Sequence, residues 1–214
     1  MKDDLPLSSD LLLRAYAMGI FPMAETRDSP DVFWVDPKHR GVLPLTGFHI
    51  SRSLARRIRR DQVSATLNHN FRATVSACAA REDTWINDEI FELYGELHDL
   101  GRAHSLEVWA NGKILGGVYG VTLGGAFFGE SMFSSATDGS KMALAFLTTH
   151  LSRCGFCLFD TQFLTDHLAS LGGYEMSRQA YHTALAHALE VRAAIGAHPV
   201  PSAQDVLQRR THTS

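Results

Sequence analysis

The feature that most constrains this chain is a stretch of apolar and small residues from 114 to 134 that contains a single charged side chain. Its two halves, 114–122 and 126–134, flank the pair Gly124 and Gly125, which is a typical turn between antiparallel strands. Neither half alternates apolar with polar residues, so both faces of the hairpin are expected to be buried. The stretch therefore predicts a central strand pair around which the rest of the chain is arranged.

Glu130 is the charged residue of this stretch, and no cation lies within four residues of it on either side. Leaving a buried carboxylate without a partner costs about 3–5 kcal/mol. One interpretation is that Glu130 receives a cation from outside the chain, and the other is that an Arg or Lys elsewhere in the fold neutralises it. The glycines along the hairpin indicate that a ligand or another backbone approaches it closely.

Composition bounds the class of protein. A chain of 214 residues with 45% hydrophobic and 20% charged residues is ordinary for a soluble globular enzyme. Its net charge of −3 gives no global basic field, so any nucleic-acid contact must come from a local patch. The three cysteines do not indicate a disulfide framework, and a cytoplasmic location is the simplest expectation. No apolar run reaches the roughly 18 residues of a membrane span, so no membrane partner is expected.

The order of elements predicts an α+β fold. A first helix over 8–18 belongs to a small N-terminal unit, 1–36, and the main domain covers 37–196. The last residues, 197–214, have no periodic pattern and are expected to form a loose tail. The predicted strands are 41–50, 62–70, 105–110, the two halves of the hairpin and 156–163. The predicted helices of the main domain are 51–60, 71–80, 89–100, 139–153, 166–172 and one that begins after Ser177.

The helix over 51–60 is strongly basic. Leu54 and Ile58 form its apolar stripe, and five arginines occupy nine consecutive residues: Arg52, Arg56, Arg57, Arg59 and Arg60. A solvated helix face is one interpretation of such a charge run. A phosphate backbone is the interpretation we favour, because no acidic residue interleaves before Asp61.

The strand over 156–163 places Asp160 and Gln162 two residues apart on one face. Their side chains can then hydrogen-bond each other, with the carboxylate accepting from the amide, or they form a satisfied polar patch at a strand end. Cys154 and Cys157 have the spacing of a metal half-site, but without a second pair they are interpreted as structural. The hairpin, helix and strand between Leu106 and Phe163 form a unit in which a sheet can open to receive an acyl donor. This arrangement predicts an acyltransferase domain of the GNAT type.

Several short motifs coincide in this chain. They are GIFP at 19–22, HISRS at 49–53, TWI at 84–86, HSLEVW at 104–109, GESMFS at 129–134, DTQ at 160–162 and HLASLG at 167–172. Together they resemble the leucyl/phenylalanyl-tRNA–protein transferases over about residues 10–182. The resemblance implies an enzyme that transfers Leu, and also Phe and Met, from aminoacyl-tRNA to the N-terminal amine of proteins that begin with Arg or Lys. The product would be marked for bacterial N-end-rule degradation.

The resemblance also assigns roles to residues. Asp160 and Gln162 match the catalytic pair of the family, and Glu130 matches an acidic residue near the acceptor peptide. An apolar pocket for the Leu or Phe side chain is expected from Trp85, Tyr94, Val118, Phe127, Met132, Leu147 and Phe159. The basic helix corresponds to the surface that binds the tRNA acceptor region. Met23 stands where the family often has a Trp near the terminal adenosine, and Met cannot stack on adenine as an indole does.

The chemistry that the resemblance implies is aminolysis of an ester. Because the ester is already activated, neither a cofactor nor a metal is expected, and the enzyme is expected to act as a monomer. Asp160 can polarise Gln162 so that its carbonyl oxygen takes a hydrogen bond from the amine. Alternatively, the pair only orients the amine while the neighbouring ribose 2′-hydroxyl carries the proton.

Two other functions are alternatives to transfer from tRNA. A GNAT acetyltransferase using acetyl-CoA needs a Gly-rich phosphate loop, whereas residues 134–140 contain one glycine and an aspartate that repels phosphate. A non-catalytic RNA-binding module would explain the arginine helix. It leaves Glu130 and the pair of Asp160 and Gln162 without a role.

Overall fold

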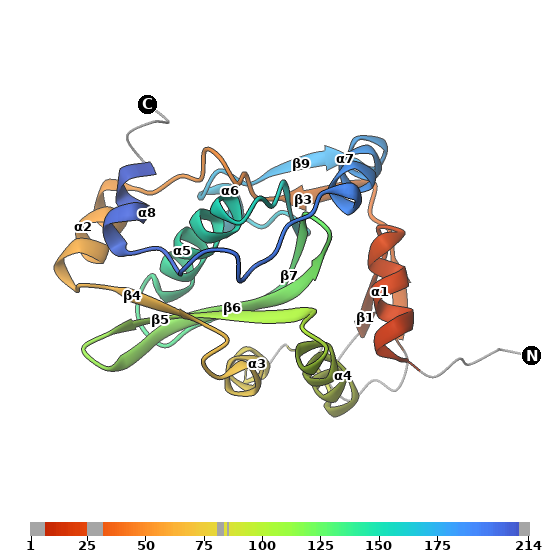
Figure 1. Cartoon of the computed structure of the whole chain (residues 1–214), viewed down its shortest axis with the longest axis horizontal. Coiled ribbons are helices and arrows are strands. Elements are labelled where there is room, and N and C mark those ends of the chain that lie inside the picture. The colour runs from red at the N-terminus through yellow and green to blue at the C-terminus, as the bar shows by residue number, and fades with distance from the viewer. Residues whose placement is uncertain (1–6, 25–31, 81–83, 85, 210–214) are drawn as a thin grey trace, which may run out of the picture.

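The computed structural model describes residues 7–24, 32–80, 84 and 86–209 of the chain (Figure 1). The helices are α1 (Ser9–Ala17), α2 (Arg52–Arg60), α3 (Phe71–Ala79), α4 (Asp88–Asp99), α5 (Gly139–Arg153), α6 (Asp166–Ala169), α7 (Arg178–Glu190) and α8 (Ala203–Arg209). The strands are β1 (Phe21–Ala24), β2 (Val32–Val35), β3 (His39–Val42), β4 (Ser64–Leu67), β5 (Ala103–Ala110), β6 (Lys113–Leu123), β7 (Ala126–Ser134), β8 (Leu158–Gln162) and β9 (Tyr174–Ser177). The predicted α+β class is confirmed.

The main sheet has the strand order β4-β5-β6-β7-β8-β3-β9, and β1 and β2 form a separate two-stranded sheet. The predicted hairpin is confirmed as β6 and β7, and Gly124 takes the left-handed backbone conformation at its turn. The pair β7–β8 is parallel and the other pairs are antiparallel. The parallel ladder ends at the pair of Phe128 with Asp160, although β7 continues to Ser134. The sheet therefore opens between these two strands just before Glu130.

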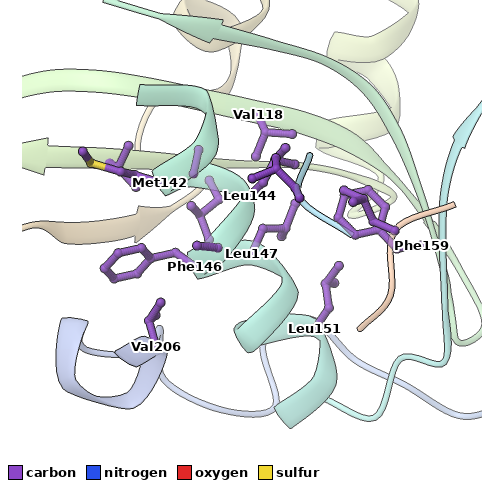
Figure 2. Close-up of a cluster of buried hydrophobic side chains, with 14 of the residues drawn as sticks. Val118, Met142, Leu144, Phe146, Leu147, Leu151, Phe159 and Val206 are labelled. Atoms are coloured by element: carbon purple, nitrogen blue, oxygen red, sulfur yellow. The ribbon is translucent and has the colours of Figure 1, made fainter. Parts of the chain in front are cut away.

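Helices cover both faces of the sheet, as the uniformly apolar hairpin predicts. Figure 1 shows α5 and α8 on one face and α3 and α4 on the other. Neighbouring residues of β7 enter different cores, because Phe127 packs into the cluster of α5 while Phe128 packs into the cluster of α3 and α4. Figure 2 shows the first cluster, in which Val118 and Phe159 of the sheet face Leu144 and Leu147 of α5. Among the described helices, none is long and apolar enough to cross a membrane.

The chain before β3 shares the core of the main sheet. Tyr16 of α1 and Phe21 of β1 are fully buried in the cluster that also contains α3 and α4. Ser8 begins α1 as its N-cap, where its side chain accepts a hydrogen bond from the amide of Leu11. Burial of Tyr16 holds α1 against the central strands, with its last turn in the interior of the molecule.

The C-terminal prediction was wrong over residues 203–209. Instead of a loose tail over 197–214, the structure has α8, whose Val206 is fully buried against α5 (Figure 2). Arg209 donates hydrogen bonds to the carbonyl oxygens of Leu45 and Thr148, which ties the helix to two distant segments. A single buried valine gives no periodic pattern, so the sequence carried little sign of this helix.

One local prediction also needs correction. The predicted strand over 41–50 ends at Val42, and the following residues run into α2 without a strand. Asp138 precedes α5 but makes no side-chain cap, because it takes the left-handed backbone conformation. Its carboxylate instead pairs with Arg57 at 3.7 Å and with Lys141 at 3.4 Å. Asp138 therefore links α2 to the start of α5.

Candidate functional site

Glu130 lies on β7 and is held by neutral donors. Tyr16 Oη lies 2.7 Å from its Oε1, and Tyr94 Oη lies 2.8 Å from its Oε2. The side-chain amide of Gln162 donates to Oε2 at 3.1 Å. Within the described part of the chain, no Arg or Lys forms an ion pair with this carboxylate. Of the two interpretations of Glu130, internal neutralisation by a cation therefore does not hold for these residues.

Burial raises the pKa of Glu130 to about 7, against the lowering effect of its hydrogen bonds with Tyr16, Tyr94 and Gln162. The number of hydrogen-bonding protons at this site also favours a protonated Glu130. The phenol oxygens of Tyr16 and Tyr94 lie only 2.8 Å apart, so they form a third short contact beside the two with Glu130. Two phenol protons cannot fill the three short contacts among Tyr16, Tyr94 and Glu130, whereas a third proton on Glu130 completes the ring. Glu130 therefore exchanges a proton close to neutral pH.

Asp160 is fully buried on β8, and it does have a cationic partner. Arg40 donates from Nε to Oδ1 at 2.9 Å and from Nη2 to Oδ2 at 2.7 Å, and Tyr181 donates to Oδ2 at 2.6 Å. Arg40 is itself 1% exposed. The sequence analysis did not identify Arg40 as a site residue. The signal that could have found it is Asp160 itself, because an aspartate on a buried strand needs a cation.

Of the two interpretations of Asp160 and Gln162, the hydrogen bond between their side chains is not formed. Asp160 Oδ1 accepts instead from the backbone amide of Gln162 at 2.7 Å, and the side chain of Gln162 turns to Glu130. This arrangement follows from the backbone of Gln162, whose φ of 64° takes it out of the regular strand alternation. The two residues are therefore neighbours that serve different partners.

A small apolar cavity of about 80 Å³ lies where the sheet opens. It is lined by Val118, Gly129, Glu130, Ser131, Met132, Leu144, Phe159, Thr161 and Leu168. Its walls therefore come from both strands of the hairpin, from β8 and from the two helices α5 and α6. Glu130 belongs to the wall, so one cavity combines an apolar lining with a carboxylate.

The predicted pocket residues divide into three groups. Val118, Met132 and Phe159 line the cavity. Phe127 and Leu147 lie in the same core without lining it, and the Phe127 ring meets Phe159 edge-on at 5.0 Å. Tyr94 forms the third group, because it belongs to the other core cluster. Of the predicted pocket residues that the structure describes, three therefore line the cavity.

Tyr94, which was predicted for the apolar pocket, does not line this cavity. It lies in the core on the opposite face of the sheet, and its hydroxyl reaches Glu130 from there. Trp85 lies outside the described residues. Leu144 and Leu168 line the cavity but were not predicted. A leucine on a predicted helix has the same sequence pattern whether it lines a cavity or packs in the core.

The five arginines of α2 differ in how far their charge is neutralised. Arg57 pairs with Asp61 at 3.4 Å and also with Asp138, and Arg60 pairs with Asp61 at 2.7 Å. Three others are exposed and form no ion pair with any described residue: Arg52, Arg56 and Arg59. Part of the basic face therefore remains available to an anionic partner.

Met23 lies in the small sheet, away from the cavity lining. It stands opposite Phe33 in the register of β1 and β2 and is partly buried. Phe33 and Trp34 of β2 are among the exposed large side chains of the described chain. An aromatic surface therefore borders the position where the family often carries Trp.

The fold is an α+β arrangement around a mixed seven-stranded sheet. A solved structure, the crystal structure of FemX, matches the fold with a TM-score of 0.50 at 12% identity, covering 78% of this chain and 66% of that one. The family model described as leucyl/phenylalanyl-tRNA protein transferase matches residues 42–186, and the model of its N-terminal domain matches residues 6–38. The chain belongs to the leucyl/phenylalanyl-tRNA–protein transferase family.

Curated relatives match over nearly the whole chain. A leucyl/phenylalanyl-tRNA–protein transferase from a Ruegeria species is 61% identical over 98% of this chain and 100% of its own length. One from Cereibacter sphaeroides is 61% identical over 97% of this chain and 98% of its own length. The resemblance inferred from the motifs is confirmed, and the protein is an aminoacyl-tRNA-dependent transferase.

Proposed function

We propose that this protein transfers Leu, and also Phe and Met, from aminoacyl-tRNA to the N-terminal amine of proteins that begin with Arg or Lys. The product carries a new peptide bond and an N-end-rule degradation signal. The observation that carries the proposal is the apolar cavity with Glu130 in its wall and Gln162 bonded to Glu130. Such a site offers an apolar space for the donor side chain next to polar groups that can hold an amine.

The protein is further proposed to act as a monomer in the cytoplasm. Its main domain, 37–196, is proposed to be of the GNAT type, with 1–36 as a small N-terminal unit. The opening of the sheet between β7 and β8 supports the GNAT assignment, because the cavity lies in that opening. The family model that ends at residue 38 supports the N-terminal boundary.

In the reaction, the acceptor nitrogen attacks the carbonyl carbon of the ester, and the bond from that carbon to the ribose oxygen breaks. The amine loses a proton and the ribose oxygen gains one. The side-chain N–H of Gln162 donates a hydrogen bond to Glu130. Among the described residues, none donates to the side-chain carbonyl oxygen of Gln162, so this oxygen can accept an N–H of the amine. An α-ammonium has a pKa of about 8, so moving its proton to Glu130 costs on the order of 1.4 kcal/mol. Glu130 is therefore proposed to bind the acceptor amine and to accept its proton.

The test is transfer of labelled Leu from charged tRNA to a peptide that begins with Arg, followed by mass spectrometry. Addition of one Leu to the peptide is the expected result. The same peptide with an acetylated N-terminus is the control and should remain unmodified. Acetyl transfer from acetyl-CoA to the peptide, or tRNA binding with no transfer, would instead support one of the two rival functions.

The cavity predicts an order of donor amino acids. Burying a Leu side chain contributes about 1.5–3 kcal/mol, and a β-branched Ile fits a space shaped for γ-branching less well. An apolar cavity that holds a benzene ring measures about 150 Å³, so the present cavity favours Leu over Phe. We expect Met132→Ala, which widens the cavity, to raise transfer of Phe relative to Leu.

Competition between charged tRNAs measures this preference. Met142→Ala is the matched control, because Met142 is buried in the same core but does not line the cavity. It should leave the ratio of Phe to Leu unchanged. Efficient transfer of Ile by the wild type, or an equal change of the ratio in both variants, would contradict the pocket assignment.

The exposed arginines of α2 are proposed to bind the phosphates of the tRNA acceptor region. Arg56→Glu combined with Arg59→Glu should weaken binding of charged tRNA and lower the slope of log affinity against log salt by about 1–2. Titrations at several salt concentrations measure both quantities. Arg72→Glu on α3 is the control and should leave the slope unchanged. An equal loss in this control would mean that overall charge, and not the α2 surface, controls binding.

A further inference from the structure

Arg40 of β3 is enclosed on all sides by groups of the site region. Its guanidinium carbon lies 4.5 Å from the ring centre of Phe21 and 4.4 Å from that of Tyr181. Its Nη1 donates to the carbonyl oxygen of Gly19 at 3.0 Å, and its other nitrogens donate to Asp160. A planar guanidinium suits this place, because it can stack on rings while it binds both oxygens of a carboxylate.

Asp160 has no hydrogen-bonding capacity left for the Gln162 side chain. A carboxylate offers about four lone-pair positions. In Asp160, Oδ1 accepts from Arg40 Nε and from the backbone amide of Gln162, while Oδ2 accepts from Arg40 Nη2 and from Tyr181 Oη. The contact of Asp160 with Gln162 is therefore made through the backbone, and the Gln162 amide group is left to bind elsewhere.

The backbone contact coincides with an unusual conformation. Gln162 has a φ of 64°, which side-chain-bearing residues rarely adopt and which costs on the order of 1 kcal/mol. An aspartate that accepts from the amide two residues further along stabilises such a turn. Opposite Gln162, a Cβ on Gly41 would lie 2.5 Å from the amide nitrogen of Leu164. Strand β3 thus packs directly on the backbone that follows Gln162.

We propose that Arg40 is a positioning residue for the transfer site. Through Asp160 it holds the Gln162 backbone in the left-handed conformation, and this conformation directs the Gln162 amide to Glu130. In this arrangement Asp160 connects Arg40 to the Gln162 backbone through hydrogen bonds and does not relay a proton. The inference rests on the proposed function for its kinetic consequence, whereas its structural consequence can be measured without transfer.

Arg40→Lys separates positioning from charge. Lysine keeps a cation beside Asp160 but loses the bidentate hydrogen bond to the carboxylate and the stacking between the rings of Phe21 and Tyr181. A misplacement of about 1 Å can cost about 100-fold in rate, so we expect kcat to fall by about that factor while KM for peptide and charged tRNA stays nearly constant. Arg72→Lys is the matched control, because Arg72 also pairs with a carboxylate and lies over an aromatic ring, but on α3. It should transfer like the wild type.

Hydrogen exchange of the Gln162 backbone amide is the second readout. We expect faster exchange in Arg40→Lys, while the amide of Leu43, which donates to the Phe159 carbonyl oxygen nearby, exchanges as in the wild type. If Arg40→Lys does not fold, Tyr181→Phe removes one donor to Asp160 and should change both readouts in the same direction by less. An unchanged exchange rate or an unchanged kcat overturns the proposal. Absence of transfer by the wild type contradicts the proposed function alone, and the exchange measurement then still decides the role of Arg40.

Discussion

The Glu130→Gln variant is expected to lose transfer activity and, at the same time, to gain stability relative to the wild type as the pH rises. In the folded protein burial raises the pKa of Glu130 to about 7 from an ordinary value of 4.5. The folded state therefore favours the protonated form, and its stability falls as pH rises through this window. The full difference amounts to about 3 kcal/mol above pH 7 and is absent below pH 4.5. A neutral glutamine does not carry this cost at any pH.

Urea unfolding at pH 4.5 and at pH 8 measures this effect. The variant loses hydrogen bonds at both pH values, so that loss cancels in the comparison, and the free energy of unfolding should shift in its favour by about 3 kcal/mol between the two. Glu175→Gln is the matched control, since Glu175 is exposed on β9 and should show no such shift. A pH-independent difference between Glu130→Gln and the wild type would show that folding does not change the pKa of Glu130. Full activity of the variant would contradict its proposed role in binding the amine.

The Arg40→Met variant is expected to be the most strongly destabilised single variant of the site. It leaves Asp160 fully buried without its cation, which costs about 3–5 kcal/mol. For a chain of this size the melting temperature should fall on the order of 10 °C. Thermal unfolding followed by circular dichroism measures the change. Arg72→Met, which breaks an exposed pair, should cost less than about 1 kcal/mol.

The double variant Arg40→Met with Asp160→Asn checks the physical reason. It removes both charges together, and asparagine can still accept the backbone amide of Gln162. Most of the lost stability should therefore return. If the double variant melts as low as Arg40→Met alone, the loss arises from the packing of the guanidinium between its two rings and not from the unpaired carboxylate.

Local patterns predicted the central fold well, because the hairpin is defined by adjacent residues. The Gly124–Gly125 turn and the continuous apolar runs are enough to place β6 and β7, and the alternation of Phe127 and Phe128 follows from strand geometry. Strands of four residues such as β3 and β9 carry too short a pattern to be recognised. Their positions are decided by pairing with β8 and with each other.

Apart from what the family resemblance implies, local pattern indicated a site residue only where that residue stood out from its own neighbours. Glu130 did so, whereas its phenol partners lie 114 and 36 residues away along the chain. A tyrosine on the apolar face of a helix, such as Tyr94, has the same pattern as any core residue. Arg40 was missed for the same reason, because the aspartate that requires it is 120 residues away. Partners brought together by tertiary structure leave no trace in local spacing.

The strand order also determines when the protein becomes competent during synthesis. Strand β3 lies between β8 and β9, so an early segment is completed on both sides by late ones. At ribosomal speed, roughly 10 seconds pass between the appearance of Arg40 and that of Asp160. A chain that stops after Ser134 but before Asp160 contains the whole hairpin and lacks both Asp160 and Gln162. Such an unfinished chain contains Arg40 without the carboxylate that Arg40 binds in the complete fold.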